Sequence, residues 1–144
     1  MNQTDVTQLR THFAHFQALL SSTPRGARLA RLLAVEWLRT RQEVPYRVAE
    51  TAAQLVAELA ANAATHGRVA GRSFRLALLA DEGVLRIEVT DTRADDLPHR
   101  RPPSLDAESG RGLLLVESLA DRWGATRGPA PQKTVWAELD LPRS

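Results

Sequence analysis

The sequence predicts an α/β fold, a two-layer α/β sandwich in which three main helices lie on one face of a mixed, mostly antiparallel sheet. Three observations predict it. Apolar residues recur every three to four positions in two long segments before residue 67, they alternate with polar residues in short segments after residue 71, and glycine or proline separates these blocks. With 144 residues and no internal repeat, the chain is expected to form a single domain over residues 1–144.

The first half of the chain predicts one strand and two helices. Residues 9 to 20 alternate imperfectly and then meet a run of helix and strand breakers at residues 21 to 26, which predicts an opening strand. From Ala27 to Arg41 the spacing predicts an amphipathic helix with arginines on its other faces. Its recurring apolar positions are Leu29, Leu32, Leu33, Trp37 and Leu38. Residues 47 to 66 predict a second, longer helix, which ends at Gly67 in the place of a C-cap glycine.

The period changes to two in the second half. Residues 74 to 78 and residues 85 to 91 alternate on either side of the turn sequence Asp81-Glu82-Gly83. This pattern predicts an antiparallel hairpin.

A long loop is expected after the hairpin. Residues 92 to 109 hold three prolines and many charges but no periodic apolar set, and loops of that length in small domains tend to be lids or binding loops. Leu113 to Trp123 then predicts a third helix, and two closing strands are expected at Gly124 to Gly128 and at Lys133 to Leu141.

Composition and charge exclude several classes of protein. Without cysteine there is no disulfide scaffold or thiolate metal site, which favours a cytoplasmic location. No stretch approaches the roughly 20 apolar residues that span a bilayer, so no membrane association is expected. Eighteen arginines stand against a single lysine, but the net charge is only +2. The densest basic stretch, residues 93 to 101, also contains Asp95 and Asp96, so no direct nucleic-acid partner is expected.

Three polar residues share one side of the second helix. Glu58, Asn62 and His66 are spaced by four and form a ladder along one side of the helix. Glu58 and Asn62 flank its apolar stripe, so they lie at the boundary between core and solvent, where a cleft can open. The alternative is an ordinary solvated helix surface.

Two further features can bind a ligand. Asp91 closes an apolar strand and offers an acceptor at its end, although a turn-forming aspartate is the alternative. Gly110-Arg111-Gly112 opens the third helix, where free backbone amides and the positive end of the helix dipole favour an anion such as phosphate. The alternative for this second feature is a flexible lead-in with a glycine N-cap.

The order of these features resembles the GHKL ATPase superfamily, which has the Bergerat ATP-binding fold. The resemblance covers nearly the whole chain and is closest to the anti-sigma-factor serine/threonine kinases, small bacterial regulators of transcription. The matching segments read ELAANAATHG from Glu58, VTD to Asp91, GRGLLLV from Gly110, LADRWG from Leu119 and KTVW from Lys133.

The resemblance implies how the chain would bind its cofactors, ATP and Mg²⁺. Asn62 would bind Mg²⁺, which would bridge the phosphates of ATP. Asp91 would accept a hydrogen bond from the adenine amino group, with Thr134 supporting the same base edge. Residues 92 to 109 would form the ATP lid. The phosphates would be cradled by Gly110, Arg111, Gly112 and Leu113.

The resemblance also implies chemistry and partners. Glu58 would be the catalytic general base, Arg111 would neutralise a terminal phosphate, and His66 would lie near the nucleotide as a lid or helix-end group. The protein would phosphorylate a serine or threonine of a small STAS-type anti-sigma-factor antagonist and would sequester a sigma factor.

Two alternatives remain. After Asp91 the chain reads Thr92-Arg93-Ala94-Asp95, whereas the family often has Asp-x-Gly-x-Gly, so the lid hinge is less permissive. This departure favours a nucleotide-gated binding module without useful phosphoryl transfer. The other alternative is a relic of the fold that no longer binds nucleotide and acts through protein contacts. The arginine-rich segment at residues 25 to 41 is expected to form either a homodimer surface or a surface for an acidic partner.

Overall fold

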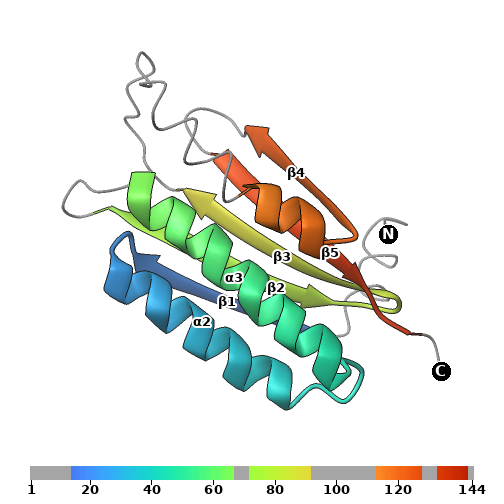
Figure 1. The fold of residues 1–144 in the computed structure, drawn as a ribbon. Coiled ribbons are helices and arrows are strands. Elements are labelled where there is room, and N and C mark those ends of the chain that lie inside the picture. The colour runs from blue at the N-terminus through green and yellow to red at the C-terminus, as the bar shows by residue number, and fades with distance from the viewer. Residues whose placement is uncertain (1–13, 67–71, 92–112, 128–132, 143–144) are drawn as a thin grey trace, which may run out of the picture.

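A computed structural model describes residues 14–66, 72–91, 113–127 and 133–142. The elements follow one another along the chain as a strand, two helices, a hairpin, a short helix and two strands (Figure 1). Their bounds are β1 (Ala14–Ser21), α2 (Pro24–Arg39), α3 (Tyr46–His66), β2 (Ser73–Ala80), β3 (Val84–Asp91), a helix at residues 113–119, β4 (Arg122–Arg127) and β5 (Lys133–Asp140).

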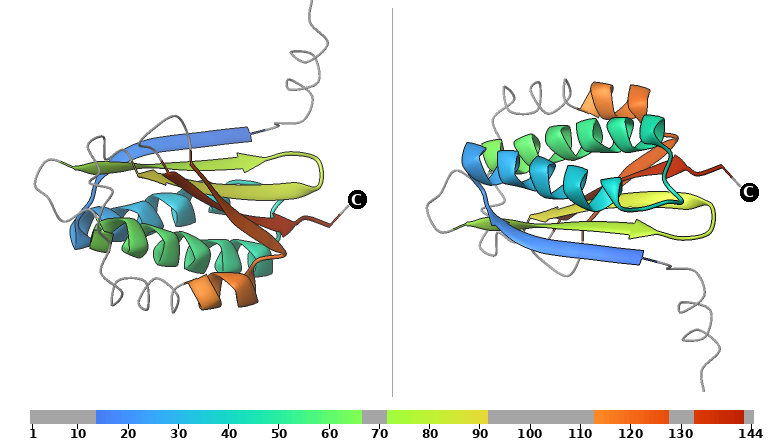
Figure 2. Two further views of the ribbon diagram at one scale, coloured as in Figure 1. Left: turned by 90° about the horizontal axis from the view of Figure 1, so that it is seen from above. Right: turned by 90° about the horizontal axis from the view of Figure 1, so that it is seen from below.

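The five strands form one sheet in the order β1-β2-β3-β5-β4, and each neighbouring pair is antiparallel. Figure 2 shows the helices together on one side of this sheet, and none of the described elements covers its other side. The two-layer α/β sandwich predicted from the sequence is therefore confirmed, and its described strand pairs are antiparallel throughout.

Helix α2 begins three residues earlier than its apolar pattern predicted, because Thr23 caps it. The Thr23 side chain accepts a hydrogen bond of 3.0 Å from the backbone N–H of Gly26, and Pro24 occupies the first turn, where it loses no hydrogen bond. The buried stripe of α2 consists mainly of small residues: Gly26, Ala30, Ala34 and Leu38. Because the helix packs against both β1 and α3, small side chains face inward, while Leu29 and Leu32 remain 45% and 59% exposed.

Helix α3 lies over the middle of the sheet, where it contacts β2, β3 and β5 (Figure 1). Its inner face carries Leu55, Val56 and Leu59, which are at most 1% exposed, and Phe74 of β2 is fully buried beneath the helices. Each such side chain contributes about 1.5–3 kcal/mol to the free energy of unfolding. Across the described ranges, no helix is both long and apolar enough to cross a membrane.

The hairpin of β2 and β3 is closed by an aspartate turn. The Asp81 carboxylate accepts hydrogen bonds from the backbone N–H groups of Gly83 and Val84, and the Asp81 N–H donates to the carbonyl of Val84. The hairpin predicted from the alternation is confirmed, and it carries Asp91 to the last position of β3.

The predicted third helix is correct at its start but wrong at its end. It stops at residue 119, and the chain turns so that the N–H of Asp121 donates to the carbonyl of Glu138. Strand β4 then begins at Arg122 instead of Gly124, and Trp123 pairs with Ala137 of β5. Pairing with β5 overrides helical periodicity here, because Trp123 is half-buried in the sheet and Arg122 forms ion pairs with Glu138 and Asp140.

The uncovered face of the sheet carries a network of alternating charges. Arg86 contacts both Glu88 and Glu138, at 2.7 and 2.8 Å, and its guanidinium lies 4.4 Å from the centre of the Trp136 ring. Burial of Glu138 opposes its ionisation, but hydrogen bonds from Arg122 and Arg86 outweigh that effect and lower the pKa of Glu138. Hydrogen bonds to Asp140 and, second, to Glu138 raise the pKa of Arg122.

Candidate functional site

One cavity lies between the C-terminal half of α3 and the β3-β5-β4 side of the sheet. It has a volume of about 90 Å³ within the described part of the chain. Its walls are mostly apolar, and its polar side chains come from three different elements. The lining residues are Leu59, Asn62 and Ala63 of α3, Val89 and Asp91 of β3, Leu113 of the short helix, Trp123 and Ala125 of β4, and Lys133 and Val135 of β5.

Strand alternation determines which residues reach this cavity. Successive side chains of a strand point to opposite faces, so Val89 and Asp91 point toward the helices and Thr90 points away. In the β3–β5 ladder, Val89 pairs with Val135 and Asp91 pairs with Lys133. Paired residues share a face, so Asp91 and Lys133 enter the cavity side by side.

The α3 residues predicted as a ladder differ in their relation to the cavity. Asn62 lines it, half-buried, one helical turn beyond Glu58. Glu58 is also half-buried, but it is not among the cavity's lining residues. His66 is the last residue of α3, and its side chain lies outside what the structure describes. The structure therefore brings Asn62 together with Asp91 and does not bring Glu58 into the lining of the cavity.

Thr134 takes a different place from the one expected. Its hydroxyl lies 2.8 Å from the hydroxyl of Thr90, with which it pairs across the strands on the face turned away from the helices. It does not line the cavity that holds Asp91. The β5 residue that reaches the position beside Asp91 is Lys133.

The segments expected to close the site lie outside the described residues. These are the lid at residues 92–109 and the residues Gly110, Arg111 and Gly112. Leu113 is described; it begins the short helix and lines the cavity (compare Figure 1). The start of that helix therefore lies at the same cavity as Asn62 and Asp91.

The described side chains suit a purine nucleotide with a hard cation. Leu59, Val89 and Val135 offer apolar walls for the flat faces of a base, and the Asp91 carboxylate offers an acceptor for an exocyclic amino group. The amide oxygen of Asn62 is a ligand of the kind that Mg²⁺ accepts while it keeps waters and phosphate oxygens. Within the described ranges, no group of three or more His, Asp or Glu side chains gathers as a metal site.

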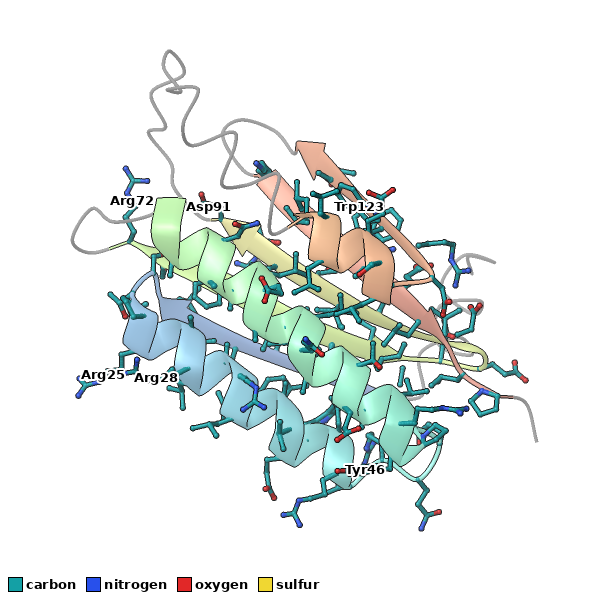
Figure 3. The ribbon with its side chains drawn as sticks, in the orientation of Figure 1. Arg25, Arg28, Tyr46, Arg72, Asp91 and Trp123 are labelled. Atoms are coloured by element: carbon teal, nitrogen blue, oxygen red, sulfur yellow. The ribbon has the colours of Figure 1, made fainter. Side chains whose placement is uncertain are left out.

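Figure 3 shows Asp91 at the end of β3 and Trp123 beside the short helix, on two sides of the same region. Of the lining residues, the sequence predicted Asn62, Asp91 and Leu113 as site residues; Trp123 and Lys133 are among those that it did not indicate. Trp123 was assigned to a helix, whereas it lies in β4. The alternation of Val135, Ala137 and Leu139 carries the signal for Lys133, because all three odd-numbered neighbours face the helices.

Comparison with known proteins gives one result that covers most of the chain. The family model for the histidine kinase-like ATPase domain matches residues 20–138. This range includes α2, α3, the hairpin, the short helix and nearly all of β5, and therefore every described wall of the cavity. A search of curated proteins found no match.

Proposed function

The chain belongs to the histidine kinase-like ATPase domain family and is an ATP-binding domain; from this premise we propose that it is a protein serine/threonine kinase that regulates transcription by binding protein partners. Its protein substrate would be a STAS-type anti-sigma-factor antagonist, and it would also hold a sigma factor. The observation that carries the proposal is the meeting of Asn62, Asp91 and Leu113 at one cavity from three separate elements.

The proposed nucleotide contacts follow the chemistry of the cavity. Asp91 accepts from the adenine amino group, and the apolar walls cover the base. Asn62 holds Mg²⁺, which supplies positive charge against the phosphate oxygens. Free backbone amides at the start of the short helix, together with Gly110, Arg111 and Gly112, bind the phosphates.

In the proposed transfer, Glu58 takes the proton from a seryl or threonyl hydroxyl of the antagonist. The hydroxyl oxygen forms a bond to the γ-phosphorus of ATP, the bond from that phosphorus to the β–γ bridging oxygen breaks, and ADP leaves. Glu58 lies one helical turn from Asn62, so both groups are carried by one rigid element.

A second candidate function is a nucleotide-gated binding module. The observation that favours it is that Glu58 does not line the cavity with Asn62 and Asp91. If Glu58 does not meet the phosphates in the bound state, ATP would set the conformation that binds a partner, and no phosphoryl group would be transferred.

A groove between α2 and α3 supports the protein-binding part of the proposal. Two adjoining cavities of about 630 and 650 Å³ share Arg31 and Ala57. The α3 wall of the first cavity consists of alanines, and Arg28 and Arg31 stand on its α2 side. The α3 wall of the second cavity alternates alanines with polar side chains. Figure 3 shows Arg25 and Arg28 projecting outward at one end of α2 and Tyr46 at the other end of the groove.

The charge of α2 favours an acidic occupant over a second copy of the chain. The helix carries four arginines and one glutamate, and Arg39 already contacts that glutamate, Glu36, at 2.9 Å. Two copies packed through α2 would bring arginine against arginine, whereas an acidic amphipathic segment of a partner would pair with these charges. The exposed Leu29, Leu32 and Val35 offer apolar contacts to such a segment.

Nucleotide binding is tested first, by thermal unfolding with and without Mg-ATP. A ligand that binds the native state alone raises the free energy of unfolding by RT ln(1 + [L]/Kd). The wild type and the exposed-turn control Glu82→Gln should show the rise, and Asp91→Asn should lose most of it. No rise at millimolar Mg-ATP in any protein would contradict nucleotide binding and favour a relic of the fold.

Phosphoryl transfer is tested with γ-labelled Mg-ATP and the STAS-domain proteins of the source organism. The kinase proposal expects label on one of these proteins, and it expects Glu58→Gln to lose the label while its ATP-dependent thermal shift stays. Label absent from all of them, with ATP still bound, would rule out the kinase on these substrates and leave the binding module.

Partner binding is tested by charge reversal in the groove. Arg31→Glu should weaken binding of the antagonist or the sigma factor by tenfold or more without changing the thermal shift with Mg-ATP. The matched control is Arg47→Glu, because Arg47 is also exposed but does not line the groove. Equal affinities for both variants would contradict the groove as the docking surface.

A further inference from the structure

Lys133 is the single lysine of the chain, and the β3–β5 register brings it to the nucleotide cavity. It lies directly across from Asp91, and both residues line the cavity together with Asn62. The rest of the lining in this region, Val89, Val135 and Ala125, carries no side-chain hydrogen-bonding group. A cation and an anion therefore stand next to each other against an otherwise apolar wall.

This pair offers one donor and one acceptor at the same end of the cavity. A carboxylate only accepts hydrogen bonds, and an ammonium group only donates them. An adenine edge has the complementary pattern, because its 6-amino group donates and the ring nitrogens on either side of that group, N1 and N7, accept. Asp91 alone can satisfy the amino group but not the neighbouring ring nitrogen.

We infer that Lys133 contacts the nucleotide directly. Its Nζ donates a hydrogen bond to one of the two adenine ring nitrogens that flank the 6-amino group, and the 6-amino group itself donates to Asp91. This inference rests on the proposed nucleotide site. It gives Lys133 the supporting role on the base edge that the sequence resemblance assigned to Thr134. Thr134 lies on the other face of β5, whereas Lys133 lies in the cavity.

A cycle of variants and nucleotide analogues tests the contact. The Kd values of the wild type and Lys133→Met are measured for ATP, 1-deaza-ATP and 7-deaza-ATP, in which a C–H replaces one ring nitrogen. For the analogue that lacks the acceptor, wild-type affinity should fall about tenfold, the size of one charge-assisted hydrogen bond. Lys133→Met should bind that analogue and ATP with equal affinity.

The cycle also separates a direct contact from an effect exerted through Asp91. If Lys133 only positions the Asp91 carboxylate, Lys133→Met will weaken the binding of ATP and of both analogues by the same factor. That result would overturn the inference. Lys133→Arg keeps the charge and a donor, so it should retain most of the discrimination between ATP and the sensitive analogue.

A spectroscopic test uses the unmodified sequence, so it does not depend on folding of a variant. Reductive methylation with ¹³C-formaldehyde labels the only lysine with its charge kept, and its dimethyl signal is distinct from that of the N-terminal amine. The lysine signal should shift on titration with Mg-ATP, and the Kd from this titration should agree with the Kd from thermal unfolding. A signal that stays in place while ATP binds overturns the inference, whereas absence of ATP binding overturns the proposed nucleotide site itself.

Discussion

The hydroxyl groups of Thr90 and Thr134 lie 2.8 Å apart, on the face of the sheet turned away from the helices. Each threonine adjoins a residue that faces the opposite way: Asp91 follows Thr90, and Lys133 precedes Thr134. The threonine pair therefore holds β3 and β5 together behind the cavity, at the point where the two strands deliver their charged side chains to it.

Thr134→Val is accordingly expected to leave ATP affinity within about twofold of the wild type. It removes one side-chain hydrogen bond, so the free energy of unfolding should fall by about 1 kcal/mol. Isothermal titration with ATP and urea unfolding measure the two effects. A loss of ATP affinity as large as that of Asp91→Asn would show that Thr134 reaches the base after all.

Trp123 should report nucleotide binding through its fluorescence, because it is the tryptophan that lines the cavity. Mg-ATP is expected to change the emission of the wild type, and Trp123→Phe should abolish that change. The matched control is Trp37→Phe. Trp37 belongs to α2, and its ring centre lies 6.1 Å from that of Phe16 in β1. A signal change that survives in Trp123→Phe and disappears in Trp37→Phe would contradict this site.

Gly26→Ala should destabilise the protein strongly, because the start of α2 approaches the end of β1 too closely for a side chain. A Cβ at position 26 would lie 1.9 Å from the backbone carbonyl oxygen of Ser21, and backbone cannot move aside cheaply. We expect the free energy of unfolding to fall by about 2–3 kcal/mol, as in other overpacked sites. Gly83→Ala, with nothing within 4 Å of the added Cβ, is the control and should change it by less than about 0.5 kcal/mol.

Glu138→Gln should lower stability in a pH-dependent way. The fold lowers the pKa of Glu138 below its ordinary value of 4.5, which applies in the unfolded chain. The ionised carboxylate therefore stabilises the native state fully at pH values above 4.5. This stabilisation is lost as the pH falls through the lower pKa that Glu138 has in the folded protein. At pH 7 we expect Glu138→Gln to lower the free energy of unfolding by about 1 kcal/mol. The value is small because Arg86 and Arg122 are partly exposed, so solvent weakens their ion pairs with Glu138.

Urea unfolding at pH 7 and below pH 4 checks the expected dependence. The difference in free energy of unfolding between the wild type and Glu138→Gln should narrow toward zero on acidification. The exposed control Glu82→Gln should differ little from the wild type at either pH. A gap that is the same at both pH values would mean that packing, rather than charge, accounts for the loss.

Local periodicity predicted most of the fold, because a helix repeats its faces every 3.6 residues and a strand every two. It located α3 to within one residue at its start, and it located the hairpin that ends at Asp91. It did less well for α2, where the pattern of Leu29, Leu32 and Leu33 suggested the inner face. Close packing against β1 and α3 buries Gly26, Ala30 and Ala34 there instead.

The sequence by itself determined the order of the elements, the position of Asn62 on α3 and the place of Asp91 at a strand end. Only the tertiary structure decided that Lys133 rather than Thr134 stands beside Asp91, and that Trp123 belongs to a strand. The physical reason is that both outcomes depend on pairing with β5. The alternation of Val135, Ala137 and Leu139 indicates which face of β5 turns inward, but only hydrogen bonding to β3 sets the register that places Lys133 across from Asp91.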